Sequence, residues 1–233
     1  MTWSIIARDK GSFGIAVATC AFAVGCREPH NAAGVGAVAT QALTNPFYGT
    51  NGLRLLREGM SASVTLATIV AGDAGRDHRQ AHVMDAAGRS AAHTGAACIP
   101  WCGDVAGDGF SLAGNMLAGA RVLDDTAAAY VANASLPFAR RLIAAMRAGE
   151  AAGGDKRGKQ SAALLICGEE EWPDLDLRVD DHAEPLAELE RLERVSRERF
   201  VPFARFLPRR GDPVGLTDRA RIDAEIAKAL DRS

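Results

Sequence analysis

Apolar and polar residues alternate at the start of the chain and then give way to an almost unbroken apolar run. Trp3, Ile5 and Ala7 are separated by single residues, which is the period of a β-strand. Residues 9–12 include the Asp and Gly that tight hairpin turns favour, and residues 13–19 are almost wholly apolar. The pattern predicts two antiparallel strands joined by a short turn, with the second strand covered on both faces.

Short strands and amphipathic helices are expected to follow in groups. The expected strands are residues 34–41, 80–85, 90–94, 97–101, 110–113, 161–167 and 175–179. The expected helices are residues 48–58, 61–70 (with Ser61 as the cap), 121–131, 137–148, 185–199 and, in the tail, 219–230. This order predicts an α+β fold, a four-layer αββα sandwich in which two mostly antiparallel sheets lie between helix layers.

The length of 233 residues is divided unequally by this pattern. Residues 1–199 form the predicted sandwich domain, and residues 200–233 form a C-terminal tail with a short helix, either a linker or an oligomer arm. Hydrophobic residues make up 48% of the chain, which excludes an intrinsically disordered protein. The longest apolar stretch, residues 13–25, is too short to span a membrane and no basic leader precedes it, so a cytoplasmic location is expected.

The net charge of −2 provides no strong attraction to nucleic acid or to an anionic membrane surface. A small-molecule substrate or ligand is therefore the expected partner, together with further copies of the chain in a homo-oligomer. Five cysteines, of which only Cys98 and Cys102 are closely spaced, do not form a zinc motif. We expect no metal and no cofactor.

Thr2 is the most informative candidate because of its position. It is small enough for Met1 to be removed, which would leave a hydroxyl group and a free α-amino group on one residue. An α-amino group has a pKa of about 7.7–8.0, which suits a base at neutral pH. A base next to a hydroxyl group is an activated nucleophile. The alternative is an ordinary strand residue, since many chains begin with Met-Thr.

Polar side chains at the ends of buried strands are the next candidates. Gln41 and Asn45 carry amides that could donate to an oxyanion or a substrate carbonyl, or could instead satisfy loop backbone. Thr94 and Asn115 have the same two interpretations. Ser4 lies two residues from the chain's Thr2, on the same face of the strand, and either supports the site or is an isolated polar residue.

The glycine-rich segment 149–158 supplies Asp155 and Lys156, and Ser161 follows it. The segment lacks the spacing of a phosphate-binding P-loop and precedes a strand rather than a helix. It is either a loop beside an active site, where Asp155 and Ser161 tune the nucleophile or bind substrate, or a structural turn. In residues 178–182, we expect Arg178 to pair with a carboxylate and Asp181 to cap the following helix.

Several segments together resemble the bacterial and archaeal family known as domain of unknown function 1028, over about residues 2–194. The segments are TWSIIARD (2–9), GVGAVATQA (34–42), NPFYG (45–49), GRDHRQ (75–80), TG (94–95), GN (114–115), AGEAAGGDKRG (148–158) and RVDDH (178–182). The resemblance implies the fold of the N-terminal nucleophile (Ntn) hydrolases, the superfamily that includes proteasome β-subunits.

Through that superfamily, the resemblance implies an amidohydrolase that cleaves an amide bond of a small molecule or peptide. Thr2 would be the nucleophile, backbone N–H groups or Asn115 would hold the oxyanion, and Asp155 would tune the nucleophile. Substrate would be bound by a further set of polar residues: Ser4, Gln41, Asn45, Thr94, Lys156 and Ser161. The alternative is a catalytically silent relative that binds a small metabolite in the same cleft.

Overall fold

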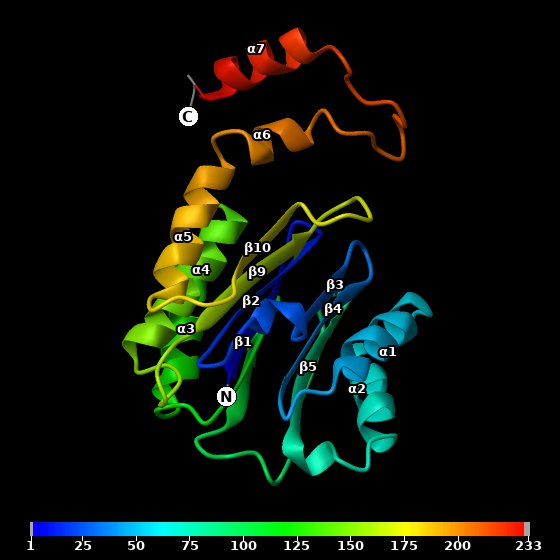
Figure 1. The fold of residues 1–233 in the computed structure, drawn as a ribbon. Coiled ribbons are helices and arrows are strands. Elements are labelled where there is room, and N and C mark those ends of the chain that lie inside the picture. Colours follow the sequence, from blue (N-terminus) through cyan, green and yellow to red (C-terminus); the bar gives the residue numbers. More distant parts are fainter. Residues whose placement is uncertain (1, 231–233) are drawn as a thin grey trace.

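The computed structural model describes residues 2–230, which form two antiparallel β-sheets packed face to face between layers of helices (Figure 1). The larger sheet has the order β10-β9-β2-β1-β8-β7, with bounds Leu175–Val179, Ser161–Cys167, Ser12–Thr19, Thr2–Asp9, Phe110–Asn115 and Gly103–Gly107. The smaller sheet has the order β3-β4-β5-β6, with bounds Pro29–Ala32, Gly36–Ala42, Arg79–Asp85 and Ser90–Thr94. The predicted sandwich of two antiparallel sheets is therefore confirmed.

Helices cover the outer face of each sheet (Figure 1). The smaller sheet is covered by α1 (Pro46–Arg57) and α2 (Ala62–Ala71), and the larger sheet by α3 (Arg121–Ala132), α4 (Phe138–Ala151) and α5 (Pro185–Ser196). Two short 3-10 helices, η1 (Val24–Cys26) and η2 (Arg76–His78), lie in the connections. None of the helices within residues 2–230 combines the length and apolar character needed to cross a bilayer.

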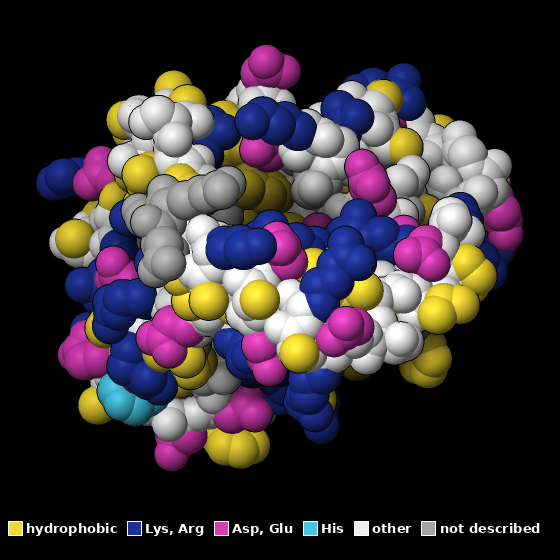
Figure 2. Space-filling view, turned by 90° about the horizontal axis from the view of Figure 1, so that it is seen from above, with side chains coloured by type: hydrophobic (Ala, Val, Ile, Leu, Met, Phe, Trp, Pro, Cys, Tyr) yellow, Lys and Arg dark blue, Asp and Glu magenta, His cyan; other side chains and the backbone are white. Residues whose placement is uncertain are grey.

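The chain then continues past the sandwich into α6 (Phe200–Ala204) and α7 (Arg219–Leu230), which lie beyond one end of the sheets (Figure 1). Ile222 and Ile226 of α7 are buried. Seen from this end, Lys and Arg side chains are interspersed with Asp and Glu over the surface (Figure 2). The interspersion agrees with the small net charge of the whole chain.

The local sequence explains where the first two helices begin. The Asn45 side chain accepts a hydrogen bond from the Phe47 backbone N–H at 3.1 Å, and Pro46 occupies the first turn of α1, where its missing N–H costs nothing. Ser61 accepts from the Val64 N–H at 3.4 Å and caps α2, as predicted. The capping role of Asn45 also fixes the loop that leaves β4.

The two faces of β1 have different partners. Trp3, Ile5 and Ala7 pack into the core between the larger sheet and its helices. Ile6 points the other way, into a second cluster between the sheets that includes Ile15 and the small residues Ala37 and Ala39 of the smaller sheet. Because successive side chains of a strand point to opposite faces, Thr2 and Ser4 also face the smaller sheet.

Two sequence expectations about local structure are wrong. Residues 97–101 form a loop rather than a strand, because Pro100 has no backbone N–H to donate and Cys98 instead closes a turn onto the Gly95 carbonyl. The strand lies later, at β7. Strand β3 was not expected at all, since residues 29–32 show no apolar alternation.

Near the end of the sandwich, Arg178 pairs with Asp180 at 2.9 Å, which confirms the expected ion pair. Asp181, by contrast, does not cap α5. Its carboxylate accepts from Gln160 at 3.1 Å, and the cap position is taken by Glu184, whose side chain makes no capping bond. The expected helix over residues 185–199 ends at Ser196.

Candidate functional site

Thr2 is the first residue of a central strand, and its neighbours bury it. β1 lies between β2 and β8, and Thr2 is paired directly with Asn115 in the β1–β8 ladder. The side chain faces the smaller sheet and only 2% of the residue's surface is exposed. The hydroxyl group of Thr2 is therefore held in the interface between the sheets, at the end where β1 begins.

The Thr2 hydroxyl group contacts two polar side chains. It lies 3.3 Å from the hydroxyl oxygen of Thr19, the last residue of β2, and 3.5 Å from Oε1 of Glu28. Thr44 donates to the same Glu28 oxygen at 3.4 Å. Glu28 precedes β3 and its backbone carbonyl accepts from the Thr40 N–H of β4 at 3.1 Å, which positions the carboxyl group.

Glu28 has an unusual environment for an acid. Its second carboxyl oxygen, Oε2, is buried and has no hydrogen-bond partner among the described residues. Burial raises the pKa of Glu28 from 4.5 to about 8, against the opposing effects of the positive charge of the chain's α-amino group and of the hydrogen bonds from Thr44 and Thr2. The group next to the Thr2 hydroxyl therefore changes its charge near neutral pH.

A chain of amide groups connects the two sheets beside Thr2. Gln41 of β4 donates through Nε2 to the Thr2 carbonyl at 3.4 Å and to Gln80 Oε1 at 2.8 Å. Asn115 Nδ2 donates to the same Gln80 oxygen at 3.0 Å. Gln80 Nε2 in turn donates to Thr94 Oγ1 and to the Gly114 carbonyl, each at 2.8 Å. These contacts fix the orientation of all three amides.

His82 extends this network deeper into the interface. Its Nε2 lies 2.9 Å from Ser4 Oγ and its Nδ1 lies 3.0 Å from Ser111 Oγ. Ser4 donates to Gln41 Oε1 at 2.7 Å, so Nε2 of His82 must carry the proton and Nδ1 must accept from Ser111. Burial lowers the pKa of His82 to about 3, and the ring is neutral at physiological pH.

Asp155 lies beside this cluster rather than against Thr2. Its carboxylate accepts from the Cys20 backbone N–H at 2.8 Å and forms an ion pair with Arg157 at 3.1 Å. Cys20 follows Thr19, so Asp155 fixes the turn that leaves β2 next to the Thr2 contact. Ser161 acts on the same connection, donating to the Ala21 carbonyl at 2.6 Å and accepting from the Val24 N–H at 3.1 Å.

The structure thus brings some of the predicted site residues into one network and leaves others outside it. Thr2, Ser4, Gln41, Thr94 and Asn115 are linked by hydrogen bonds, directly or through Gln80. Asn45 instead caps α1 and donates to Asp73 at 3.0 Å, and Lys156 is exposed and donates to the Pro100 carbonyl at 2.9 Å.

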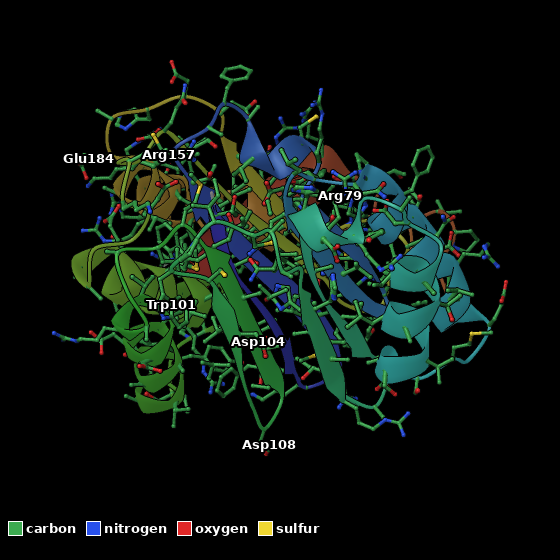
Figure 3. The ribbon with its side chains drawn as sticks, turned by 90° about the horizontal axis from the view of Figure 1, so that it is seen from below. Arg79, Trp101, Asp104, Asp108, Arg157 and Glu184 are labelled. Carbon is green, nitrogen blue, oxygen red and sulfur yellow. The ribbon has the colours of Figure 1, made fainter. Side chains whose placement is uncertain are left out.

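Figure 3 looks onto the end of the sandwich at which β1 begins. Arg157 lies on the side of the larger sheet and Arg79 on the side of the smaller sheet. Both arginines are neutralised by neighbouring carboxylates, Arg157 by Asp155 and Arg79 by Asp73 at 3.2 Å. The labelled Trp101 is on the side of the larger sheet, near α3.

Six further side chains take part in these hydrogen bonds and were not among the predicted site residues: Thr19, Glu28, Thr44, Gln80, His82 and Ser111. Gln80 and His82 could have been found, because they alternate along an expected strand and share a face with Met84. Glu28 carried no signal, since it lies before a strand that the apolar pattern does not reveal.

Comparison with known proteins identifies the group to which this arrangement belongs. The model of a family of unknown function, DUF1028, matches residues 2–189. A crystal structure of a DUF1028 protein from Silicibacter pomeroyi has a TM-score of 0.86 and 33% sequence identity, and the match covers 93% of this chain and 99% of that chain. No curated protein matches the chain.

Proposed function

Since this chain belongs to the family of unknown function DUF1028, its activity has to be inferred from its own site, and we propose that it is an Ntn hydrolase-like amidohydrolase acting through Thr2. The substrate is an amide bond of a small molecule or peptide. The observation that carries the proposal is the position of Thr2, at the start of a central strand with its hydroxyl in a buried polar cluster.

Removal of Met1 supplies the base in this reaction. The Thr2 hydroxyl attacks the amide carbonyl carbon, and its proton passes to the free α-amino group of the same residue. The carbonyl oxygen becomes an oxyanion, which backbone N–H groups or the Asn115 amide stabilise. When the tetrahedral intermediate collapses, the C–N bond breaks and the proton goes to the leaving amine. Water then hydrolyses the ester on Thr2.

The surrounding residues hold the nucleophile in place. Gln41 binds the Thr2 carbonyl, and Ser4 fixes the Gln41 oxygen. Asn115 is anchored by one N–H to Gln80, which leaves its second N–H for the oxyanion. Asp155 and Ser161 hold the segment that follows Thr19. Ordered neighbours of this kind keep a nucleophile in its reactive geometry.

Thr2→Ala tests the proposal, with hydrolysis of a panel of small amides and dipeptides as the readout. The mature N-terminus is measured in parallel by intact-protein mass spectrometry. We expect Thr2 at the N-terminus and loss of all hydrolysis in Thr2→Ala. Thr50→Ala, which removes an exposed hydroxyl from α1, is the matched control and retains activity. Full activity in Thr2→Ala, or complete retention of Met1, would contradict the mechanism.

The burial of Thr2 favours one second candidate, a protein that binds a small metabolite in the same place without turning it over. Only 2% of the Thr2 surface is exposed, which restricts the approach of a substrate carbonyl. A ligand that binds only the folded state raises the melting temperature. Thermal-shift screening against metabolites therefore separates the two functions: a stabilising ligand that stays intact on prolonged incubation supports binding alone.

A further inference from the structure

Glu28 is a buried acid that the mechanism above does not use, and it lies against the proposed nucleophile. Its Oε1 accepts from the Thr2 hydroxyl at 3.5 Å and from the Thr44 hydroxyl at 3.4 Å. The single hydroxyl hydrogen of Thr2 has two acceptors within reach, Thr19 at 3.3 Å and the Glu28 carboxyl oxygen at 3.5 Å, and only the carboxyl group can take up the proton. This is the relationship between a nucleophile and a base.

A structural role alone explains this carboxyl group poorly. Glu28 exposes only 9% of its surface, and its Oε2 has no partner among residues 2–230. A buried carboxyl group without a cation or a full set of donors costs stability. The described hydrogen bonds to the Glu28 carboxyl group come only from hydroxyl groups, so no Lys or Arg side chain offsets that cost through one of them.

Burial also brings the pKa of Glu28 close to neutral pH, where a general base is effective. It raises the pKa of Glu28 to about 8, so an appreciable fraction of the carboxyl group is ionised near neutral pH and that fraction is much more basic than an ordinary carboxylate.

We propose that Glu28 is a general base for Thr2 and that it acts whether or not Met1 has been removed. The inference rests on the proposed function, because it assigns a second base to the same nucleophile. The two bases differ in what they require. In a chain that keeps Met1, Thr2 has no free amine, but Glu28 still activates the Thr2 hydroxyl group.

Glu28 carries one proton in each half of the reaction. Ionised Glu28 takes the proton of the Thr2 hydroxyl on Oε1 as the bond between Oγ1 and the carbonyl carbon forms. When the C–N bond breaks, protonated Glu28 returns this proton to the leaving amine. In deacylation, Glu28 takes a proton from the attacking water and returns it to Oγ1 as the ester breaks. No oxidant, metal or other co-reactant is required.

The positive charge of the chain's α-amino group acts on Glu28 and lowers its pKa, by less than burial raises it. Arg27 and His30 lie one and two residues away in the sequence, and burial lowers the pKa of His30. Beyond Thr19, Asp155 and Arg157 neutralise each other. On the other side of Thr2, the neutral ring of His82 bonds to Ser4 and Ser111 rather than to Glu28.

A small β-lactone tests the proposal, because it acylates a hydroxyl nucleophile by ring opening and adds its whole mass. The full chain is expressed while the methionine aminopeptidase of the host is partly inhibited, so one sample holds chains with and without Met1. Intact-protein mass spectrometry follows acylation of each species separately, and peptide mapping locates the adduct. Thr2→Ala reports the background.

We expect Thr2 to be acylated in the chains that retain Met1, at a rate that rises with pH through the ionisation of Glu28. In Glu28→Gln, which cannot accept the proton, that rate falls about 100-fold or more. Acylation confined to chains without Met1, or an unchanged rate in Glu28→Gln, would overturn the role of Glu28 and leave Thr2 as the nucleophile. Absence of Thr2 acylation in both species would overturn both proposals.

Thr44→Val provides a second test that does not alter either reacting group. Thr44 is only partly buried, and its hydroxyl stabilises the ionised form of Glu28. Its removal raises the pKa of Glu28 further, so the pH profile of acylation in Met1-retaining chains moves to higher pH. We expect the rate at neutral pH to fall about threefold to tenfold. An unmoved profile in a folded Thr44→Val protein would contradict the proposal.

Discussion

Gln41 of the smaller sheet holds the backbone carbonyl of Thr2 in the larger sheet, through an N–H···O contact of 3.4 Å across the interface. The same amide nitrogen donates to Gln80 at 2.8 Å, and its oxygen accepts from Ser4 at 2.7 Å. One side chain therefore connects the proposed nucleophile to the whole polar network. The position of Thr2 depends on the pairing of two sheets as well as on its own strand.

Gln41→Leu removes this connection. The Ser4 hydroxyl loses its acceptor in a fully buried site, so we expect the free energy of unfolding to fall by about 1–3 kcal/mol. Urea unfolding measures the loss. Gln160→Leu is the matched control, because Gln160 is less buried than Gln41 and its side-chain amide donates to Asp181 near the surface. This substitution should change the free energy of unfolding little. Equal effects of the two substitutions would argue against a structural role for the network.

Asn115→Ala tests the assigned oxyanion donor. Asn115 pairs with Thr2 in the ladder, and loss of one such donor lowers kcat by about 100- to 1,000-fold in other hydrolases. We expect that loss in kcat with a much smaller change in KM, measured with any amide that the wild-type chain hydrolyses. Asn133→Ala, which removes an amide from the end of α3, should leave kcat unchanged. A change confined to KM would instead assign Asn115 to substrate binding.

His82 makes stability depend on pH in the acidic range. Its pKa is 6.5 in an unfolded chain and about 3 in the folded protein, so between these values the unfolded state binds more protons. As pH falls through this window, His82 therefore lowers the free energy of unfolding by about 1.4 kcal/mol per pH unit. His82→Gln should abolish this contribution, whereas His78→Gln, at an exposed position, should not. Urea unfolding at several pH values measures both slopes.

Glu28 makes the free energy of unfolding depend on pH with the opposite sign to His82. Its pKa rises from 4.5 in the unfolded chain to about 8 in the folded protein, so the folded state binds more protons between these values. Its contribution is fully present below about pH 4.5 and is lost as pH rises through 8. Glu28→Gln should remove this loss, and exposed Glu198→Gln should not. In the wild-type chain, Glu28 and His82 oppose each other between about pH 4.5 and 6.5.

Local sequence patterns were sufficient for most of the architecture. The period of Trp3, Ile5 and Ala7, the turn at residues 9–12 and the cap at Ser61 each reflect interactions between residues close in the chain. Strand β3 was missed because its residues are all partly buried and lack an apolar face. Residues 97–101 were misassigned because apolar composition alone does not show that Pro100 interrupts a ladder.

For the site, the sequence by itself determined that a threonine follows Met1 at the head of an apolar hairpin, and that amides lie at the ends of neighbouring strands. Only the tertiary structure decided which polar groups meet. Glu28 reaches Thr2, 26 positions away, and His82 reaches Ser4, 78 positions away. Gln80 joins the same network through Gln41, which it meets because the chain folds into packed sheets. Burial then moves the pKa values of Glu28 and His82 in opposite directions, because low polarity disfavours whichever form is charged.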